Sequence, residues 1–328
     1  MTRARVFFWL RLAFGVTVLL LLVFGVADFD AVAQTLRTLH PATFLIALAG
    51  NAVATVVVPA LVTSHTLRAG SLRIPIGELM RINLALRFYV LVLPHAVTWG
   101  IRWLRYRGER PGHGWQAAAL IVFERVIQFA VLVFFAFFFL LWAGSGVPTS
   151  LRVLVPVSAV CFLVGLLSAL TFVSPRLHRM AIPIIRAVAR RSPRFLAQRI
   201  DRMLEAVAAH QQLSHRRVAA VVGWTVVAHL LSVTMAYLIS LELRLPADYA
   251  AIAWMRSAVV VVSMLPVTVG GIGIREAGFA GLLYIHGADA SDALALPLSL
   301  LAIQLLIGLT GAAVELLHVL TRDRSAAA

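Results

Sequence analysis

The sequence SMLPVTVGGIGIREAGF, residues 263–279, lies between apolar segments but contains residues that an ordinary membrane helix excludes. Its helix-breaking positions are Pro266, Gly270, Gly271 and Gly273. Arg275 and Glu276 then place two charges in apolar surroundings, where charges are costly and mark a candidate functional site. In hydrocarbon every backbone N–H and C=O group needs a partner, so such a break is expected only inside protein or beside a polar cavity. The alternative is an ordinary loop between two short spans, with both charges at the lipid surface.

The composition defines the class of protein. Hydrophobic residues make up 61% of the 328 residues and charged residues 13%. A soluble domain has about 45–50% apolar and about 25% charged residues, so this composition indicates a membrane protein. The net charge of +15 is carried by arginine alone, since the chain has no lysine. Because these arginines lie between apolar segments, we expect them to meet anionic lipid rather than nucleic acid. The single cysteine, Cys161, excludes a disulfide framework within the chain.

Six apolar segments have the length of a membrane-spanning helix, about 20 residues or more. They cover residues up to about 26, 42–66, 116–143, 153–173, 218–241 and 293–320. Two further apolar regions, 82–100 and 250–286, are interrupted by proline and contain charges. The sequence therefore predicts an all-α polytopic membrane protein with about six spanning helices and two broken elements.

The distribution of arginine indicates how the two broken elements run. If residues 82–100 crossed the membrane fully, the arginine-rich loop expected at 102–110 and the ten-arginine connector after the fourth span would both face outward. If both broken elements return to the side from which they entered, 22 arginines face the cytoplasm and three face outward, namely Arg37, Arg152 and Arg244. We therefore predict two re-entrant elements that enter from opposite faces of a bacterial cytoplasmic membrane, with both chain termini in the cytoplasm.

The chain is interpreted as one integral membrane domain, residues 1–328, with two halves. The first half covers 1–173 and the second 218–328, and a basic cytoplasmic connector covers 174–217. The connector is predicted to contain an amphipathic helix on the membrane surface, because apolar residues recur at helical spacing. These residues are Leu196, Ile200, Met203 and Val207.

The two broken elements resemble each other. LVLPHAVTWGIR, residues 91–102, and SMLPVTVGGIGIR, residues 263–275, each place an arginine eight or nine residues after a proline. Paired interrupted segments in the two halves of a membrane protein are typical of inverted repeats that form a transporter's binding site. The pattern therefore indicates a possible inverted repeat.

The segment PVTVGGIGIRE, residues 266–276, resembles the Pro-x-x-x-Gly-Gly-x-Gly-x-Arg-Glu signature of a flippase-like membrane family. This family includes the transmembrane region of bacterial lysylphosphatidylglycerol synthases, and the order of spans and the pair Glu124-Arg125 agree with it. The first half departs from the family pattern, because PHAVTWGIR has one glycine and no acid. The resemblance implies the lipid-moving part of such a protein, without the soluble aminoacyl-transferase domain.

A site that moves a phospholipid must shield a charged phosphate from hydrocarbon, where its transfer is prohibitively costly. Arginine offers guanidinium groups that match phosphate, glycine lets backbone N–H groups approach, and a helix N-terminus attracts anions. The acids are expected to pair with the arginines when no substrate is bound, although both pairs could serve the fold alone. The candidate substrate-binding residues are Arg87, Pro94, Arg102, Glu124, Arg125, Arg256, Pro266, Gly270, Gly271, Gly273, Arg275 and Glu276.

The leading interpretation is a lipid translocase whose partners are an anionic phospholipid or lipid-linked substrate and the membrane. One alternative is an integral membrane enzyme that uses Glu276 or Glu124 as an acid–base group on a lipid-linked substrate. Another is an accessory subunit that anchors a separate lipid-modifying enzyme. Neither a cofactor nor a metal is expected, since GGIG lacks the lysine and the preceding strand of a phosphate-binding loop and no zinc motif is present. We therefore expect a transport protein rather than an enzyme.

Overall fold

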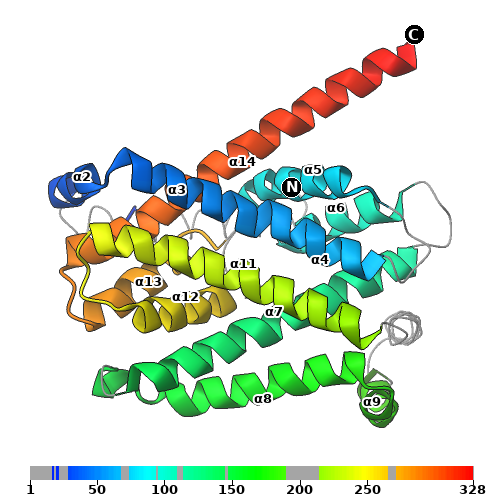
Figure 1. Ribbon diagram of the computed structural model, residues 1–328, viewed down its shortest axis with the longest axis horizontal. Helices are drawn as coiled ribbons and strands as arrows, with labels where there is room; N and C mark the ends of the chain where they lie inside the picture. The colour runs from blue at the N-terminus through cyan, green and yellow to red at the C-terminus, as the bar shows by residue number, and fades with distance from the viewer. Residues whose placement is uncertain are drawn as a thin grey trace.

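The computed structural model describes residues 17, 20–21, 29–67, 74–93, 95–108, 114–144, 147–189, 214–264 and 271–327. Every regular element in these ranges is a helix (Figure 1). Four predicted features lie wholly or almost wholly outside them: the first spanning helix, the surface helix of the connector, the prolines Pro94 and Pro266, and Gly270.

Five helical segments are long and apolar enough to cross a membrane within the described ranges. The first is composite, because α3 (Pro41–Ala52) continues through a π-helical turn, η2 (Val53–Val57), into α4 (Val58–Leu67). The others are α7 (Gly114–Ala143), α8 (Leu154–Val173) after the 3₁₀ turn η4 (Thr149–Leu151), α11 (His215–Glu242) and α14 (Ala290–Ala327). They match five of the six predicted spans, and the prediction of an all-α polytopic membrane protein is confirmed.

Two helical hairpins separate these spans. The first consists of α5 (Ile76–Val92) and α6 (His95–Arg107), the second of α12 (Tyr249–Ser263) and α13 (Ile274–Ile285). Helices of 12 to 17 residues are about 18–26 Å long, which is less than the hydrocarbon core of about 30 Å. They correspond in sequence to the two broken elements for which re-entrance is predicted.

In each hairpin the start of the first helix lies beside the end of the second. Tyr106 at the end of α6 is buried in one cluster with Leu79 from the first turn of α5. The ring centroids of Trp254, early in α12, and His286, just after α13, are 5.7 Å apart. The described helix ends Val92 and His95 in the first hairpin, and Ser263 and Ile274 in the second, therefore lie at the hairpin tips.

The bounds of the first hairpin differ from the prediction. Residues 102–110 were expected to form an arginine-rich loop, but Arg102, Arg105 and Arg107 belong to α6, so this expectation is wrong as far as residue 107. Aromatic residues between the arginines explain the difference, because Tyr106 is buried and the Trp103 ring lies 5.2 Å from the Arg107 guanidinium. The helix therefore buries apolar faces while its arginines turn toward polar partners.

The same order of elements occurs twice, as a span, a hairpin and a span: α3–α4, α5–α6 and α7, then α11, α12–α13 and α14. Helix α5 of the first set packs along α14, the last helix of the second set, and α12 of the second set packs along α7, the last helix of the first. Figure 1 shows the α5–α6 hairpin and the α12–α13 hairpin toward opposite ends of the molecule. This order supports the predicted repeat.

Two peripheral helices complete the described chain. Helix α2 (Phe29–Thr38) packs against α14, and α9 (Pro175–Ala189) follows α8 at the edge of the molecule (Figure 1).

The contact of α5 with α14 is unusually close. A Cβ atom added at Gly311 of α14 would lie 2.1 Å from the backbone oxygen of Leu84, and one added at Gly308 would lie 2.3 Å from the Leu91 side chain. Small residues at such positions let membrane helices approach backbone to backbone. The first hairpin is therefore held directly against the last span.

Candidate functional site

The five arginines predicted as substrate-binding residues lie on the two hairpins and on α7. They are Arg87 on α5, Arg102 on α6, Arg125 on α7, Arg256 on α12 and Arg275 on α13. Two carboxylates, Glu124 on α7 and Glu276 on α13, form ion pairs with members of this set. The site therefore consists of two groups, one in each half of the chain.

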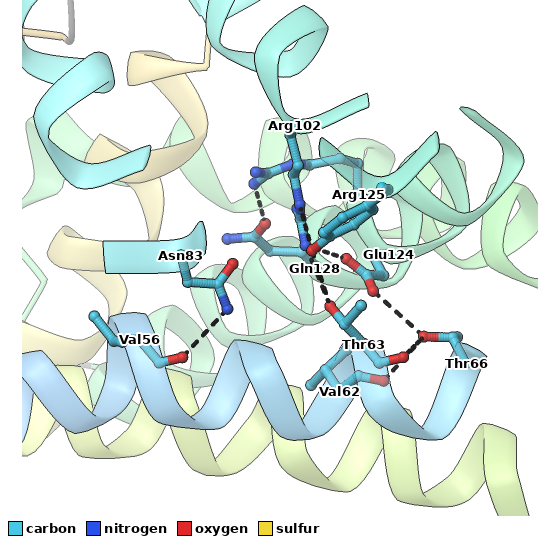
Figure 2. Close-up of polar contacts among 10 residues, drawn as sticks. Val56, Val62, Thr63, Thr66, Asn83, Arg102, Glu124, Arg125 and Gln128 are labelled. Atoms are coloured by element: carbon cyan, nitrogen blue, oxygen red, sulfur yellow. Dashed lines mark hydrogen bonds and ion pairs between the residues drawn. The ribbon is translucent and has the colours of Figure 1, made fainter. Parts of the chain in front are cut away.

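The first group is built around an ion pair between Arg102 and Glu124. Arg102 Nη2 donates to Glu124 Oε2 at 2.6 Å, and both side chains are only 7% exposed. Arg102 Nε donates to the Tyr106 hydroxyl at 2.9 Å, and Arg102 Nη2 lies 3.3 Å from Thr63 Oγ1. Figure 2 shows this network between α4, α6 and α7, with Thr66 donating to Glu124 at 3.3 Å. The pair thus joins three helices, and Glu124 is matched with a distant arginine rather than with its neighbour Arg125.

Two more arginines, Arg87 and Arg125, lie close to this pair, and neither forms an ion pair with a carboxylate among the described residues. Arg125 Nη1 donates to Gln128 Oε1 at 2.6 Å, and its guanidinium lies 5.7 Å from the Trp99 ring (Figure 2). The Nε atoms of Arg87 and Arg125 are buried and have no hydrogen-bond partner among the described residues. Arg87 and Arg125 lie within electrostatic reach of each other and of Arg102. Three guanidinium groups therefore lie near one another, and two of them, those of Arg102 and Arg125, also lie near the Glu124 carboxylate.

The second group lies at the N-terminus of α13, where the predicted glycine-rich turn ends. Gly273 has a φ of +86° and Gly271 a φ of +77°, which side chains rarely adopt. Glu276 is fully buried and accepts the Gly273 N–H at 2.7 Å. It also accepts hydrogen bonds from Arg275 Nε at 2.9 Å and Nη2 at 2.5 Å. The carboxylate of Glu276 therefore takes the position at the helix N-terminus that an anion would take.

Arg275 has a second partner that the sequence did not reveal. Its Nη1 donates to Gln304 Oε1 on α14, 29 residues along the chain. One turn later on α14, a Cβ atom at Gly308 would lie 3.5 Å from the backbone oxygen of Arg87. The two groups of arginines therefore border the same stretch of α14. A lone polar residue in an apolar span, such as Gln304, is a signal that could have identified this partner.

Among the described residues, Arg256 is held by a hydroxyl group instead of a carboxylate. Arg256 Nη2 and Nε donate to Ser232 Oγ on α11 at 2.5 and 3.2 Å, and Ser232 donates to Asn51 on α3 at 3.4 Å. Asn83 of α5 donates to the Val56 oxygen of the π turn at 3.2 Å (Figure 2). Polar contacts therefore connect both hairpins to the composite span, and π turns are frequent at functional sites.

At the start of α5, Arg81 and Glu78 form a hydrogen-bonded ion pair at 2.5 Å. The hydrogen bonds from Arg81 hold the pKa of Glu78 below its ordinary value, so this carboxylate stays charged at neutral pH.

A pocket of about 430 Å³ lies between α2, α3 and α14. Its lining contains no charged side chain and consists of Leu36, Leu39, Pro41, Phe44, Leu45, Leu298, Ser299 and Ala302. Such a lining suits hydrocarbon and offers nothing for a charged group, so the candidate site remains with the arginines.

Comparison with known proteins gives the family. No curated protein matches the chain. The model of the family described as "Lysylphosphatidylglycerol synthase TM region" matches residues 8–311, which is most of the 328 residues. The chain therefore belongs to the family of the lysylphosphatidylglycerol synthase transmembrane region and is a multi-pass membrane protein.

Proposed function

We propose that the protein is a lipid translocase of the flippase type in the bacterial cytoplasmic membrane. Its substrate is a phospholipid or a lipid-linked headgroup with an anionic phosphate, which moves past the arginines of both hairpins. The termini face the cytoplasm in this proposal, because that orientation places most arginines on the side where positive residues accumulate.

The observation that carries the proposal is the excess of positive charge in the candidate site. Five arginines face two carboxylates, and no described carboxylate forms an ion pair with Arg87, Arg125 or Arg256. A charge inside a membrane protein is costly unless an opposite charge or a polar cavity compensates it. An anion from the substrate would supply that compensation, and guanidinium groups are well suited to phosphate oxygens.

We assign two roles within this set. Within the candidate site, Arg87, Arg125 and Arg256 contact the phosphate before Arg102 and Arg275 do, since no described carboxylate competes for them. Arg102 and Arg275 contact the headgroup only after Glu124 and Glu276 have released them, so these pairs compensate charge when no lipid is bound. The turn at Gly271 and Gly273 keeps the α13 N-terminus close to the passing headgroup, and Pro94, Pro266 and Gly270 belong to the same proposal by their sequence positions.

The contacts of the acids favour transport over an enzyme of lipid-linked substrates. Glu124 and Glu276 are each held by a guanidinium group at 2.5–2.6 Å, the arrangement of an ion pair rather than of a free acid–base group. Transport, unlike an enzymatic reaction, requires no covalent change in the lipid and therefore no free acid–base group.

The test uses the purified protein in liposomes that contain phosphatidylglycerol with a fluorescent headgroup. Quenching from the outside measures movement between leaflets, and chromatography of the extracted lipid measures chemical change. We expect movement with unchanged lipid, and about a tenfold loss of rate for Arg125→Gln, which corresponds to about 1.4 kcal/mol. Arg152→Gln is the matched control, because Arg152 is exposed outside the site.

Two results would contradict the proposal. One is a chemically altered lipid, which would favour the enzyme. The other is an Arg125→Gln protein that moves lipid as fast as the Arg152→Gln control.

A further inference from the structure

A third group of charged and polar side chains joins the α5–α6 hairpin to α14, with Arg81 and Arg105 from the open end of the hairpin and Tyr89 from nearer its tip. Its centre is Glu315, a buried residue on α14. Three donors from the hairpin meet this one carboxylate. Arg105 Nη2 and the Tyr89 hydroxyl donate to Oε1, the latter at 3.3 Å, and Arg81 Nη1 donates to Oε2 at 3.4 Å. Both arms of the hairpin are thereby tied to the last span.

This arrangement has the features of an anion site. Two guanidinium groups and a phenol from different helices converge on two oxygens of one anionic group. A phosphate ester also presents two anionic oxygens to such donors, and arginine binds carboxylate and phosphate with similar two-oxygen geometry. The donors therefore do not distinguish a carboxylate of the chain from the phosphate of a ligand.

The exposure of Arg105 and the size of the cavity beside it show what would have to change for a ligand to bind. The Arg105 side chain is 31% exposed, so one edge of the group can be reached from outside. The cavity beside it, lined by Tyr89, Arg105 and Glu315, has a volume of about 10 Å³. That volume holds about one water molecule, far less than a phosphate. An external anion can therefore reach these donors only when the Glu315 carboxylate moves away.

The position of the group relates it to the candidate site. Arg105 follows Arg102 by three residues, so both lie on neighbouring parts of one face of α6. Arg102 belongs to the buried group with Glu124, and Arg105 is the more exposed of the two. A headgroup that passes along this face from the open end of the hairpin meets Arg105 before Arg102.

We propose that Arg105, with Tyr89 and Arg81, forms a second phosphate-binding site at the entrance to the candidate site. The Glu315 carboxylate competes with the phosphate for these donors. In the ligand-free state Glu315 holds the hairpin against α14. An incoming phosphate replaces Glu315 on Arg105, and the hairpin is released from α14 at this end. The contact of Glu315 is thus autoinhibitory.

The roles of the two arginines differ. Arg81 also binds Glu78, at 2.5 and 2.8 Å, so it keeps a carboxylate partner after Glu315 leaves. Arg105 forms an ion pair with Glu315, and no second acid holds it in the described part of the chain. Arg105 is therefore the main phosphate ligand, and Arg81 and Tyr89 assist it.

The test measures binding of phosphatidylglycerol to the full-length protein in detergent by native mass spectrometry or fluorescence titration. Glu315→Gln removes the competitor but keeps its size, so we expect it to bind phosphatidylglycerol about tenfold more tightly. The double variant Glu315→Gln/Arg105→Gln should lose this gain. Glu242→Gln is the matched control, because Glu242 is an acid at the end of another span, α11, that accepts the His40 N–H.

Two outcomes would overturn the inference. If Glu315→Gln lowers the melting temperature and leaves phosphatidylglycerol affinity at the level of Glu242→Gln, Glu315 only joins the helices. If the gain persists in the double variant, the phosphate binds elsewhere. If Glu315→Gln fails to fold, the Arg105→Gln single variant decides. The inference requires Arg105→Gln to bind phosphatidylglycerol more weakly than wild type, and an unchanged affinity contradicts it.

Competition separates two sources of the phosphate group. A gain for phosphatidylglycerol that inorganic phosphate does not compete away assigns a lipid headgroup, and effective competition assigns free phosphate at the same site. This inference rests on the proposed function for the choice of a lipid as ligand. Its test measures lipid binding, whereas the test of the proposed function measures lipid movement. A protein that binds as expected and moves no lipid would therefore contradict the proposed function alone.

Discussion

The two hairpins occupy equivalent places in the two halves, yet they hold their arginines in different ways. Arg102 in the first hairpin depends on an acid from another helix, Glu124 on α7. Arg275 in the second hairpin depends mainly on its own neighbour, Glu276, whose carboxylate also caps α13. The first arrangement joins helices, whereas the second is assembled largely within one turn. Equivalent substitutions in the two hairpins should therefore have different consequences for stability.

The largest difference is expected when each arginine is removed. Arg102→Ala leaves Glu124 buried with Thr66 as a weak donor at 3.3 Å, and loss of one partner of a buried pair costs about 3–5 kcal/mol. Arg275→Ala leaves Glu276 with the Gly273 N–H and the helix N-terminus, and the Arg275 side chain is 20% exposed, so the cost is about 1–3 kcal/mol. Melting of both variants in the same detergent measures the difference. Equal losses would mean that the cap contributes nothing.

Conservative substitution separates binding from stability in the second hairpin. Arg275→Lys keeps the positive charge but loses the planar fork that contacts Glu276 and Gln304. We expect a lipid movement rate about tenfold below wild type, the effect of losing about one charge-assisted hydrogen bond, with the protein still folded. Liposome assays and melting curves on the same preparation test this. A wild-type rate, or a rate that falls only in step with stability, would assign Arg275 to the scaffold.

The smallest effects concern one glycine in each hairpin. Gly271 has a φ of +77°, and an added Cβ would lie 3.3 Å from Ser263 Cβ, so Gly271→Ala should lower stability by about 1–2 kcal/mol. Gly100 lies within α6 with open space around a Cβ, so Gly100→Ala should raise stability by about 0.5–1 kcal/mol. Thermal or denaturant unfolding shows whether the two changes have opposite signs. Changes of the same sign would contradict the assigned turn at Gly271.

The parts of the molecule that could be predicted are those that depend on residues close in sequence. The five confirmed spans follow from continuous apolar length, and the second hairpin follows from the break and from the adjacent pair Arg275 and Glu276. Family resemblance was carried by the same local segment, and the family match confirmed it.

The contacts between distant residues could not be predicted. Arg102 and Glu124 are separated by 22 residues, and Arg81 and Glu315 by 234, so composition and periodicity contain no information on their pairing. The extent of α6 was missed because an arginine-rich segment was taken for a loop, although Trp103 and Tyr106 pack within the protein. Such segments become helical when the surrounding helices supply partners for their charges, and this depends on tertiary structure.

The π turn Val53–Val57 has a consequence for how one span serves both halves. A π turn adds one residue to an α-helix, and each residue of an α-helix advances by about 100°, so the faces before and after it are out of phase. Before the turn, Asn51 meets Ser232 of α11, and after it, Thr63 and Thr66 meet Arg102 and Glu124. Removing one residue within Val53–Val57 would rotate one of these polar faces by about 100° away from its present partners, while leaving the span long enough to cross.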